Sequence, residues 1–161
     1  AYENMALPLE EGSSLSQPKT IAFMLELLEP KQNQKILEIG SGSGYVLALL
    51  SEMIKKGKIY GMEINKNLAI KSKRVLANNP NIEIFNKSGF EGLPKFAPYD
   101  AILISASCQD MRIPYNLSEQ LKDQGVLVTP VQSSIFKIKK QEGKISEEEF
   151  PGFAFVPLRK E

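Results

Sequence analysis

The chain of 161 residues contains no histidine, and this absence excludes whole classes of catalytic site. Ser-His-Asp and Cys-His nucleophile systems need an imidazole as the general base. Zinc sites that use imidazole are excluded for the same reason, and a single cysteine cannot replace the missing ligands. A general base can come only from a carboxylate, a lysine or a tyrosine. We therefore expect no metal site and a chemistry that needs little acid–base help.

Cysteine, net charge and long apolar runs are also scarce. Cys108 is the only cysteine, so no internal disulfide can form, and a reducing, cytoplasmic location is expected. Lys and Arg number 20 against 19 Asp and Glu, which leaves no basic excess of the kind that nucleic-acid binders show. No apolar run is long enough to cross a bilayer. We expect a monomer that binds neither nucleic acid nor membrane.

The stretch Lys35–Tyr45 carries the strongest local pattern. Its apolar half predicts a strand, its glycine-rich half predicts a tight turn, and the residues after it predict a helix with one buried stripe. That stripe comprises Val46, Leu49, Leu50 and Met53. A glycine turn lets a ligand approach the main chain, and the first N–H groups of the helix point at that ligand. The pattern is half of a nucleotide-binding βαβ unit, with a ligand-free connection as the alternative.

Two acidic residues and the spacing of the glycines indicate which class of ligand the turn would bind. Tyr45 stands where a dinucleotide fingerprint would need its last glycine, so the pattern is G-x-G-x-G preceded by Glu38. This arrangement resembles the first motif of S-adenosylmethionine-dependent methyltransferases. Glu63 ends a predicted strand over Lys58–Glu63, about 20 residues beyond the loop, where a carboxylate can accept hydrogen bonds from ribose hydroxyls. The alternative for Glu63 is a solvated charge at a strand end.

The remaining elements are predicted from apolar runs between turn signals. Helices are expected from Ser16 to Pro30, from the glycine loop to near Gly57, over Asn67–Asn78 with Leu68, Val75 and Leu76 facing in, and around Leu117–Lys122. Strands are expected over Ile82–Phe85, Tyr99–Ser105, Gly125–Val131, Ser134–Lys140 and Phe153–Leu158. The charges of Lys137, Lys139 and Lys140 are expected to guard an exposed strand edge, and Glu147–Glu149 to occupy a solvated turn.

The alternation of strands and helices defines the expected fold class. Up to residue 122 it predicts a parallel α/β sheet, and the run of strands that follows predicts an antiparallel edge. At this length we expect one domain over residues 1–161. Its parts would be an extended leading segment (1–15), a cofactor-binding α/β part (16–122) and C-terminal strands (123–161).

Seven pieces in order give the chain a specific resemblance. They are Ala1-Tyr2-Glu3 with Leu7-Pro8, Leu15-Ser16-Gln17-Pro18, Leu37–Tyr45, Gly89 with Gly92, Ala97–Ile104, Val126–Val131 and Phe155–Leu158. Over nearly its whole length the sequence resembles protein-L-isoaspartate O-methyltransferases. The Leu-Ser-Gln-Pro and FVPL pieces separate this family from other methyltransferases. The resemblance implies a Rossmann-like methyltransferase fold, mostly parallel, with helices on both faces of the sheet and an antiparallel C-terminal edge.

The resemblance also implies the reaction. A methyl group would pass from S-adenosyl-L-methionine to the α-carboxyl of L-isoaspartyl residues in damaged peptides and proteins, and collapse of the ester to a succinimide would begin repair. The absence of histidine agrees with this, because a carboxylate is already ionised at pH 7 and needs no base. The work left to the protein would be alignment and the exclusion of water.

Site residues follow from the same resemblance, position by position. Ser16 would be the active-site hydroxyl, with a helix cap beside Pro18 as its alternative. The cofactor would be held by Glu38, Gly40, Gly42 and Gly44 at its methionine end, by Glu63 at its ribose, and by Ser88 and Gly89 beside its adenine. Ser41, Ile64 and Ser105 would be further cofactor-binding residues. The substrate would lie near Ala106 and the main chain of Val128 to Val131, with Phe155, Val156 and Pro157 close by.

Two other functions stay open from the sequence. One is a methyltransferase of the same fold with another carboxylate or small-molecule acceptor. The other is a non-catalytic relic that keeps the cofactor-binding fold.

Overall fold

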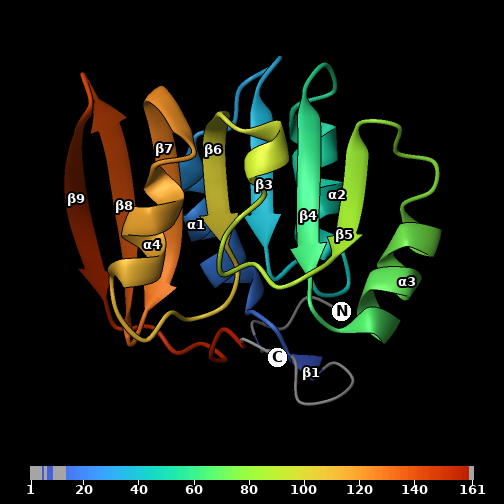
Figure 1. Ribbon diagram of the computed structural model, residues 1–161. Coiled ribbons are helices and arrows are strands. Elements are labelled where there is room, and N and C mark those ends of the chain that lie inside the picture. The colour runs from blue at the N-terminus through green and yellow to red at the C-terminus, as the bar shows by residue number, and fades with distance from the viewer. Residues whose placement is uncertain (1–4, 6, 9–13, 160–161) are drawn as a thin grey trace.

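The structure is a computed structural model that describes residues 5, 7–8 and 14–159 (Figure 1). Most of the predicted leading segment, with its Ala1-Tyr2-Glu3 piece, lies outside the described residues. The helices are α1 (Pro18–Leu28), α2 (Tyr45–Met53), α3 (Lys66–Val75) and α4 (Arg112–Ser118), with a short 3₁₀ helix η2 (Pro94–Phe96). The strands are β1 (Leu7–Pro8), β2 (Ser14–Leu15), β3 (Lys35–Ile39), β4 (Lys58–Glu63), β5 (Ile82–Asn86), β6 (Tyr99–Ile104), β7 (Leu121–Val131), β8 (Ser134–Gln141) and β9 (Lys144–Pro151).

One seven-stranded sheet organises the molecule, in the order β5-β4-β3-β6-β7-β8-β9. Strands β5, β4, β3, β6 and β7 run parallel to their neighbours, while β8 and β9 are antiparallel. The expected mostly parallel sheet with an antiparallel C-terminal edge is confirmed. The antiparallel part begins one strand later than predicted, because β7 pairs in parallel with β6.

Helices cover both faces of the sheet, as predicted, and each face has its own apolar core (Figure 1). Helices α1 and α2 pack on one face, where Ile36 and Leu103 are buried. Helix α4 packs on the other face, where Leu37 and Ile102 are buried. Side chains of a strand alternate between faces, so a strand in the middle of two cores must be apolar at nearly every position. This is why β3 and β6 read as continuous apolar runs.

Strand β4 begins and ends at the predicted residues, whereas α2 differs from its prediction. It ends at Met53 rather than near Gly57, and Met53 is 43% exposed, so its assignment to the buried stripe is wrong. Leu47 is fully buried instead. The glycine at position 61 of β4 leaves room for it: a Cβ there would meet Leu47 Cδ1 at 2.6 Å. The buried stripe of α2 therefore includes Leu47 rather than Met53.

Two other helices also depart from their predicted bounds. Helix α3 ends at Val75, which is 69% exposed rather than facing in, although Leu68 and Leu76 are buried as predicted. The helix expected around Leu117–Lys122 lies earlier as α4, and residues 121–122 already belong to β7. Pro114 is the third residue of α4, where a proline costs no intrahelical hydrogen bond.

The C-terminal part holds the largest error of the sequence prediction. Glu147–Glu149 do not form a turn but belong to β9, the edge strand, which pairs with β8. The turn lies earlier, at Glu142 (φ +51°) and Gly143 (φ +73°). Most β9 side chains are exposed on both faces of the strand. The sequence therefore lacks the alternation of apolar and polar residues from which a strand could have been predicted. Conversely, Phe153–Leu158 is not a strand but an irregular segment with a single bridge, between Pro157 and Ser107.

The predicted role of the β8 lysines is also corrected. Because β9 covers β8, Lys137, Lys139 and Lys140 do not guard an edge. The side chain of Lys137 is only 9% exposed and its ammonium forms an ion pair with Glu29. Glu29 lies at the C-terminal end of α1, so this pair ties the helix to the sheet.

Both the glycine turn and Ser105 lie where parallel strands end, at the lower edge in Figure 1. Ligands of open α/β sheets bind at this edge. Among the described residues, no helix is long and apolar enough to span a membrane.

Candidate active site

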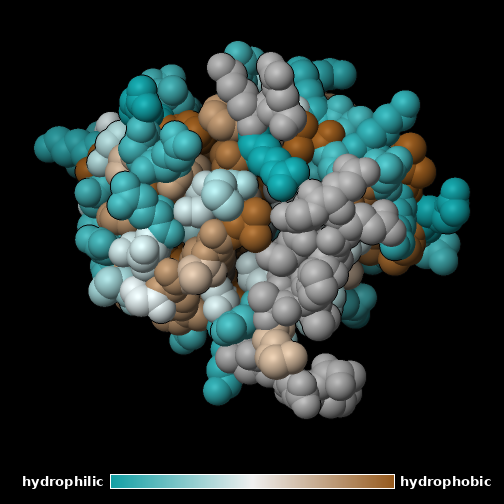
Figure 2. All heavy atoms as spheres, turned by 90° about the horizontal axis from the view of Figure 1, so that it is seen from below, coloured by the Kyte–Doolittle hydropathy of each residue, from teal (hydrophilic) through white to brown (hydrophobic). Residues whose placement is uncertain are grey.

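Three adjoining hollows, all lined in part by Ser105, lie at the carboxyl ends of the parallel strands. Figure 2 looks onto this edge and shows apolar and weakly polar residues, in brown, tan and white, beside hydrophilic ones in teal. Gly40, Gly42 and Ser105 line both the first and the second hollow. The turn and the end of β6 therefore form a shared wall between them.

The glycines of the turn are required by its backbone. Gly40, Gly42 and Gly44 have φ of +79°, +52° and +83°, a region that L side chains rarely adopt. A Cβ on Gly44 would also meet Leu76 Cδ1 at 2.7 Å. The main-chain N–H groups of Gly40 and Ser41 donate to Met62 O, which fastens the turn to the end of β4.

The first hollow has a buried acid at its base. Glu38 is 1% exposed, and Ser105 Oγ donates a hydrogen bond of 2.7 Å to its Oε1. Burial raises the pKa of Glu38 to about 8, with Ser105 opposing the rise and the nearby Glu63 charge adding to it. Glu38 Oε2 and Ser41 Oγ are buried and have no hydrogen-bond partner among the described residues. Unpaired buried oxygens of this kind call for a donor, and a cation suits a carboxylate best.

The second hollow contains Glu63, which is 6% exposed. Both of its oxygens accept main-chain hydrogen bonds: Gly42 N–H donates to Oε2 at 2.7 Å and Asn65 N–H donates to Oε1 at 2.8 Å. Glu63 is thus no solvated strand-end charge, because it holds the glycine turn. A carboxylate has about four lone-pair positions, so its oxygens can accept further bonds from a ligand.

Apolar residues form much of the rest of the second hollow, which Lys87 and Arg159 also line. Ile39, Met62 and Ile64 supply a flat apolar lining, and the hollow measures about 630 Å³ with the solvent at its mouth. Gly89 completes it, since a Cβ there would lie 2.2 Å from Ile39 Cγ2. A planar, largely apolar group fits such a slot.

The third hollow opens on the α1 side and shares Ser16 with the first. Its other walls are the start of α1, with Thr20, and the C-terminal segment, with Phe155 and Val156. Ser16 precedes the N-cap of α1, which is Gln17, so the helix-cap alternative for Ser16 is wrong. Ser16 is therefore a residue that the two hollows share.

Most predicted site residues gather around these hollows. Those that line at least one of them are Ser16, Glu38, Gly40, Ser41, Gly42, Glu63, Ile64, Gly89, Ser105, Ala106, Phe155, Val156 and Pro157. Gly44 shapes the turn from behind. Ser88 lines none of the three, although both its neighbours in the chain line the second. Their binding roles stay predictions.

The prediction for Val128–Val131 concerns their main chain, and the structure places the side chains of Val128 and Val131 in the cores. Val128 is fully buried under α1, and Val131 is 6% exposed in the core beneath α4. Neither side chain lines a hollow, because both face the cores that cover the sheet. Any substrate contact of this strand is left to its main chain.

Several lining residues were not predicted to belong to a site. They include Ile21 and Met24 of α1 in the first hollow, and Lys87, Leu158 and Arg159 in the second. Ile21 and Met24 could have been predicted to line the site from the sequence, since they lie in the first turns of the helix that follows Ser16. No local sequence pattern could have placed residues 158 and 159 in the lining of the second hollow.

The site is consistent with one two-part ligand. The unpaired oxygens of Glu38 and Ser41 suit an amino group, and the slot beside Glu63 suits a nucleoside. A glycine turn after the central strand, with acids at the ends of β3 and β4, fits S-adenosyl-L-methionine. The fold and the site are those of an S-adenosylmethionine-dependent methyltransferase.

Comparison with known proteins narrows the class to a family. The family model for protein-L-isoaspartate(D-aspartate) O-methyltransferase matches residues 1–161. A protein-L-isoaspartate O-methyltransferase of Pyrobaculum islandicum is 41% identical, over 99% of this chain and 80% of its own length. One from Dictyoglomus turgidum is 40% identical, over 100% of this chain and 74% of its own. The chain belongs to the protein-L-isoaspartate(D-aspartate) O-methyltransferase family.

Solved structures agree with this fold. A protein-L-isoaspartate O-methyltransferase structure superposes with a TM-score of 0.87 at 26% identity, covering 97% of this chain and 53% of its own. A Plasmodium falciparum chain in complex with S-adenosyl-L-homocysteine superposes with a TM-score of 0.86 at 23% identity, covering 99% of this chain and 82% of its own.

Proposed function

We propose that the protein methylates the α-carboxyl of L-isoaspartyl residues in damaged peptides and proteins and so initiates their repair. Bound S-adenosyl-L-methionine would supply a methyl group on a sulfonium. The observation that carries the proposal is the position of Ser16. This residue lines both the hollow that contains Glu38 and the open hollow on the α1 side. A donor in the first and an acceptor in the other would meet at this residue.

The cofactor would be held at both ends by residues of this chain. Glu38, Ser41 and the glycine turn would hold the amino-acid end, with Ser105 fixing the Glu38 carboxyl. Glu63, Ile64 and Gly89 would hold the nucleoside, and Ser88 stays a predicted neighbour of the adenine.

The acceptor would be oriented rather than activated. A carboxylate is ionised at pH 7, so no protein group has to remove a proton before it attacks. Ser16 Oγ–H would donate to this carboxylate and aim it, while Ala106, Phe155 and Val156 would wall it off from water. We further propose that the protein acts as a cytoplasmic monomer.

The test is product analysis with two peptides that differ only in having isoaspartate or aspartate at one position. With S-adenosyl-L-methionine present, mass spectrometry should find a methyl ester on the isoaspartyl peptide only, followed by loss of methanol as the succinimide forms. Equal methylation of both peptides, or of neither, would overturn the proposal. Methylation of another acceptor alone would favour a same-fold methyltransferase with a different substrate.

A further inference from the structure

The segment Phe153–Leu158, here named the C-terminal strip, runs along the lower end of the sheet in Figure 1 and packs against the cores of both faces. Phe153 and Phe155 pack against the core beneath α1, whereas Leu158 packs against the core beneath α4. Its main chain is fastened along the way. Phe153 N–H donates to Ser133 O at 2.9 Å, and Leu158 N–H donates to Ser107 O at 2.7 Å.

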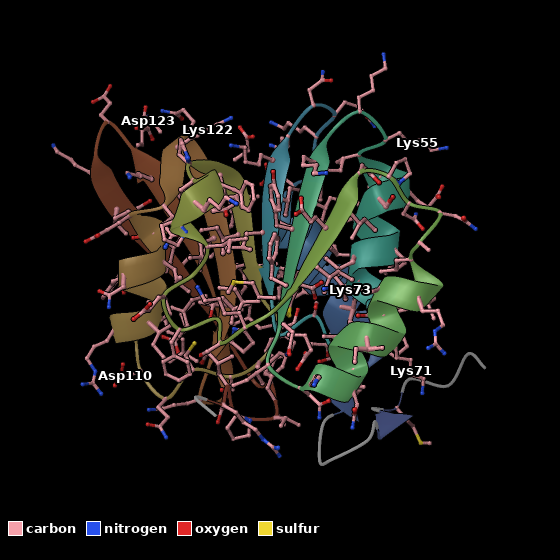
Figure 3. All side chains as sticks on the ribbon, turned by 45° about the vertical axis from the view of Figure 1, so that its right-hand side comes forward. Lys55, Lys71, Lys73, Asp110, Lys122 and Asp123 are labelled. Carbon is pink, nitrogen blue, oxygen red and sulfur yellow. The ribbon has the colours of Figure 1, made fainter. Side chains whose placement is uncertain are left out.

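A fourth hollow lies at the α4 end of this strip and measures about 1110 Å³ with the solvent at its mouth. Leu158 lines both this hollow and the second one, and Val156 lines both the second and the third. The hollows therefore follow one another along the strip, from the α1 face to the α4 face. Figure 3 shows Asp110, a rim residue of the fourth hollow, at the end of the molecule opposite Lys122 and Asp123.

The lining of the fourth hollow favours an uncharged, apolar occupant. Phe90, Ile113 and Leu158 are only partly buried and turn apolar surface toward the hollow. The two rim charges neutralise each other, because Arg112 Nε donates to Asp110 Oδ2 at 2.9 Å and a second guanidinium nitrogen lies 2.7 Å from the same oxygen. Burying an apolar side chain here would be favourable, whereas a charged one would find no free partner in that ion pair.

We propose that the fourth hollow is a specificity subsite for an apolar side chain of the polypeptide acceptor, on one side of the methylated residue. This inference rests on the proposed function, since the acceptor must be a polypeptide to reach two hollows at once. An extended chain advances about 3.3–3.6 Å per residue, so a residue a few positions from the isoaspartate can reach the α4 side. The subsite would therefore read the sequence around the damaged residue.

The experiment measures kcat/KM for a set of isoaspartyl peptides. Each has isoaspartate at its centre in a serine background, with leucine, lysine or glutamate placed at one flanking position at a time. We expect leucine to raise kcat/KM about tenfold over serine at one or two adjacent positions on one side only, with no gain for lysine or glutamate. No preference at any position would overturn the inference.

Variants in and just after α4 test whether the leucine preference arises in the fourth hollow. Asn116 lines the fourth hollow, and Asn116→Trp should fill it, reducing the leucine preference below twofold while the all-serine isoaspartyl peptide is still methylated. Glu119→Trp is the matched control, because Glu119 is exposed, follows α4 and does not line the hollow. A leucine preference that survives Asn116→Trp would overturn the inference.

Two other outcomes are distinguishable. If the all-serine isoaspartyl peptide is not methylated at all, the proposed function fails rather than the subsite alone. If light scattering shows a wild-type dimer that Asn116→Trp converts to a monomer, the occupant is a second copy of this chain, and the inference is overturned.

Discussion

At the scale of single residues, Glu38 has the most unusual surroundings in the site. It is a fully buried carboxyl with a serine hydroxyl on one oxygen and no partner among the described residues on the other. Burial holds its pKa near 8, so the residue is mostly protonated at neutral pH until a cation arrives. Its environment is thus arranged for a ligand rather than for stability.

This environment predicts a pH dependence of stability. Because the folded-state pKa of Glu38 is raised from 4.5 to about 8, the folded protein keeps a proton that the unfolded chain has lost between these values. The free energy of unfolding should fall as pH rises from 5 to 8, by up to about 1.4 kcal/mol per pH unit from this group. Glu38→Gln should remove that slope in urea denaturation, and Glu26→Gln, at an exposed position of α1, should retain it. Parallel profiles for wild type and Glu38→Gln would contradict the assignment.

Ser16 carries the second prediction at this scale. If its hydroxyl aims the acceptor carboxylate, Ser16→Ala should lower kcat at least about tenfold, a loss of ~1.4 kcal/mol in transition-state stabilisation. The Kd for S-adenosyl-L-homocysteine, measured by calorimetry, should change less than twofold. Thr20→Val is the matched control, because Thr20 lines the third hollow but not the first. An unchanged kcat in Ser16→Ala would leave Ser16 without a catalytic role.

At the scale of elements, the sequence predicted the helices and strands whose burial produces a recognisable pattern of apolar residues. Strand β4 was placed to the residue and β6 nearly so, because both are buried on two faces. Strand β9 was missed because its exposed glutamates leave no period, although the glycine at 143 marked the turn before it. The C-terminal strip was predicted as a strand because Phe153 and Phe155 alternate and pack on one core, but its main chain pairs only at the bridge between Pro157 and Ser107.

The ion pair between Lys137 and Glu29 gives a prediction for α1. The Lys137 ammonium is buried, whereas the Glu29 side chain is 51% exposed. Glu29→Gln should therefore lower the free energy of unfolding by about 1–3 kcal/mol, because a buried charge loses its charged partner. Lys137→Met should cost less, since Glu29 stays hydrated. Urea denaturation at pH 7 measures both, and a larger loss in Lys137→Met would contradict the account.

The same pair should lose its effect in acid. Lys137 lowers the pKa of Glu29 below 4.5 through a hydrogen bond and its charge. The stabilisation is present above pH 4.5 and disappears as pH falls through the lowered pKa, when Glu29 takes up a proton. The difference between wild type and Glu29→Gln should accordingly shrink in strongly acidic buffer.

At the scale of the whole molecule, the site is an arrangement of hollows that no single motif encodes. The glycine turn, Glu38 and Glu63 could be predicted because they lie at fixed positions relative to two strands. The shared walls could not, because they join Ser16 to Ser105 and Val156 through chain crossings that only the folded sheet creates. The orientation of the Val128 and Val131 side chains could not be predicted either, since it depends on how two cores cover β7.

The most direct test of this arrangement is a crystal structure of the protein with S-adenosyl-L-homocysteine and an isoaspartyl peptide. It should show the amino group of the cofactor product at Glu38 and Ser41, the ribose at Glu63, and the peptide carboxylate beside Ser16 in the third hollow. A nucleoside bound away from Glu63, or a carboxylate that reaches the cofactor from any side other than that of Ser16, would contradict the account.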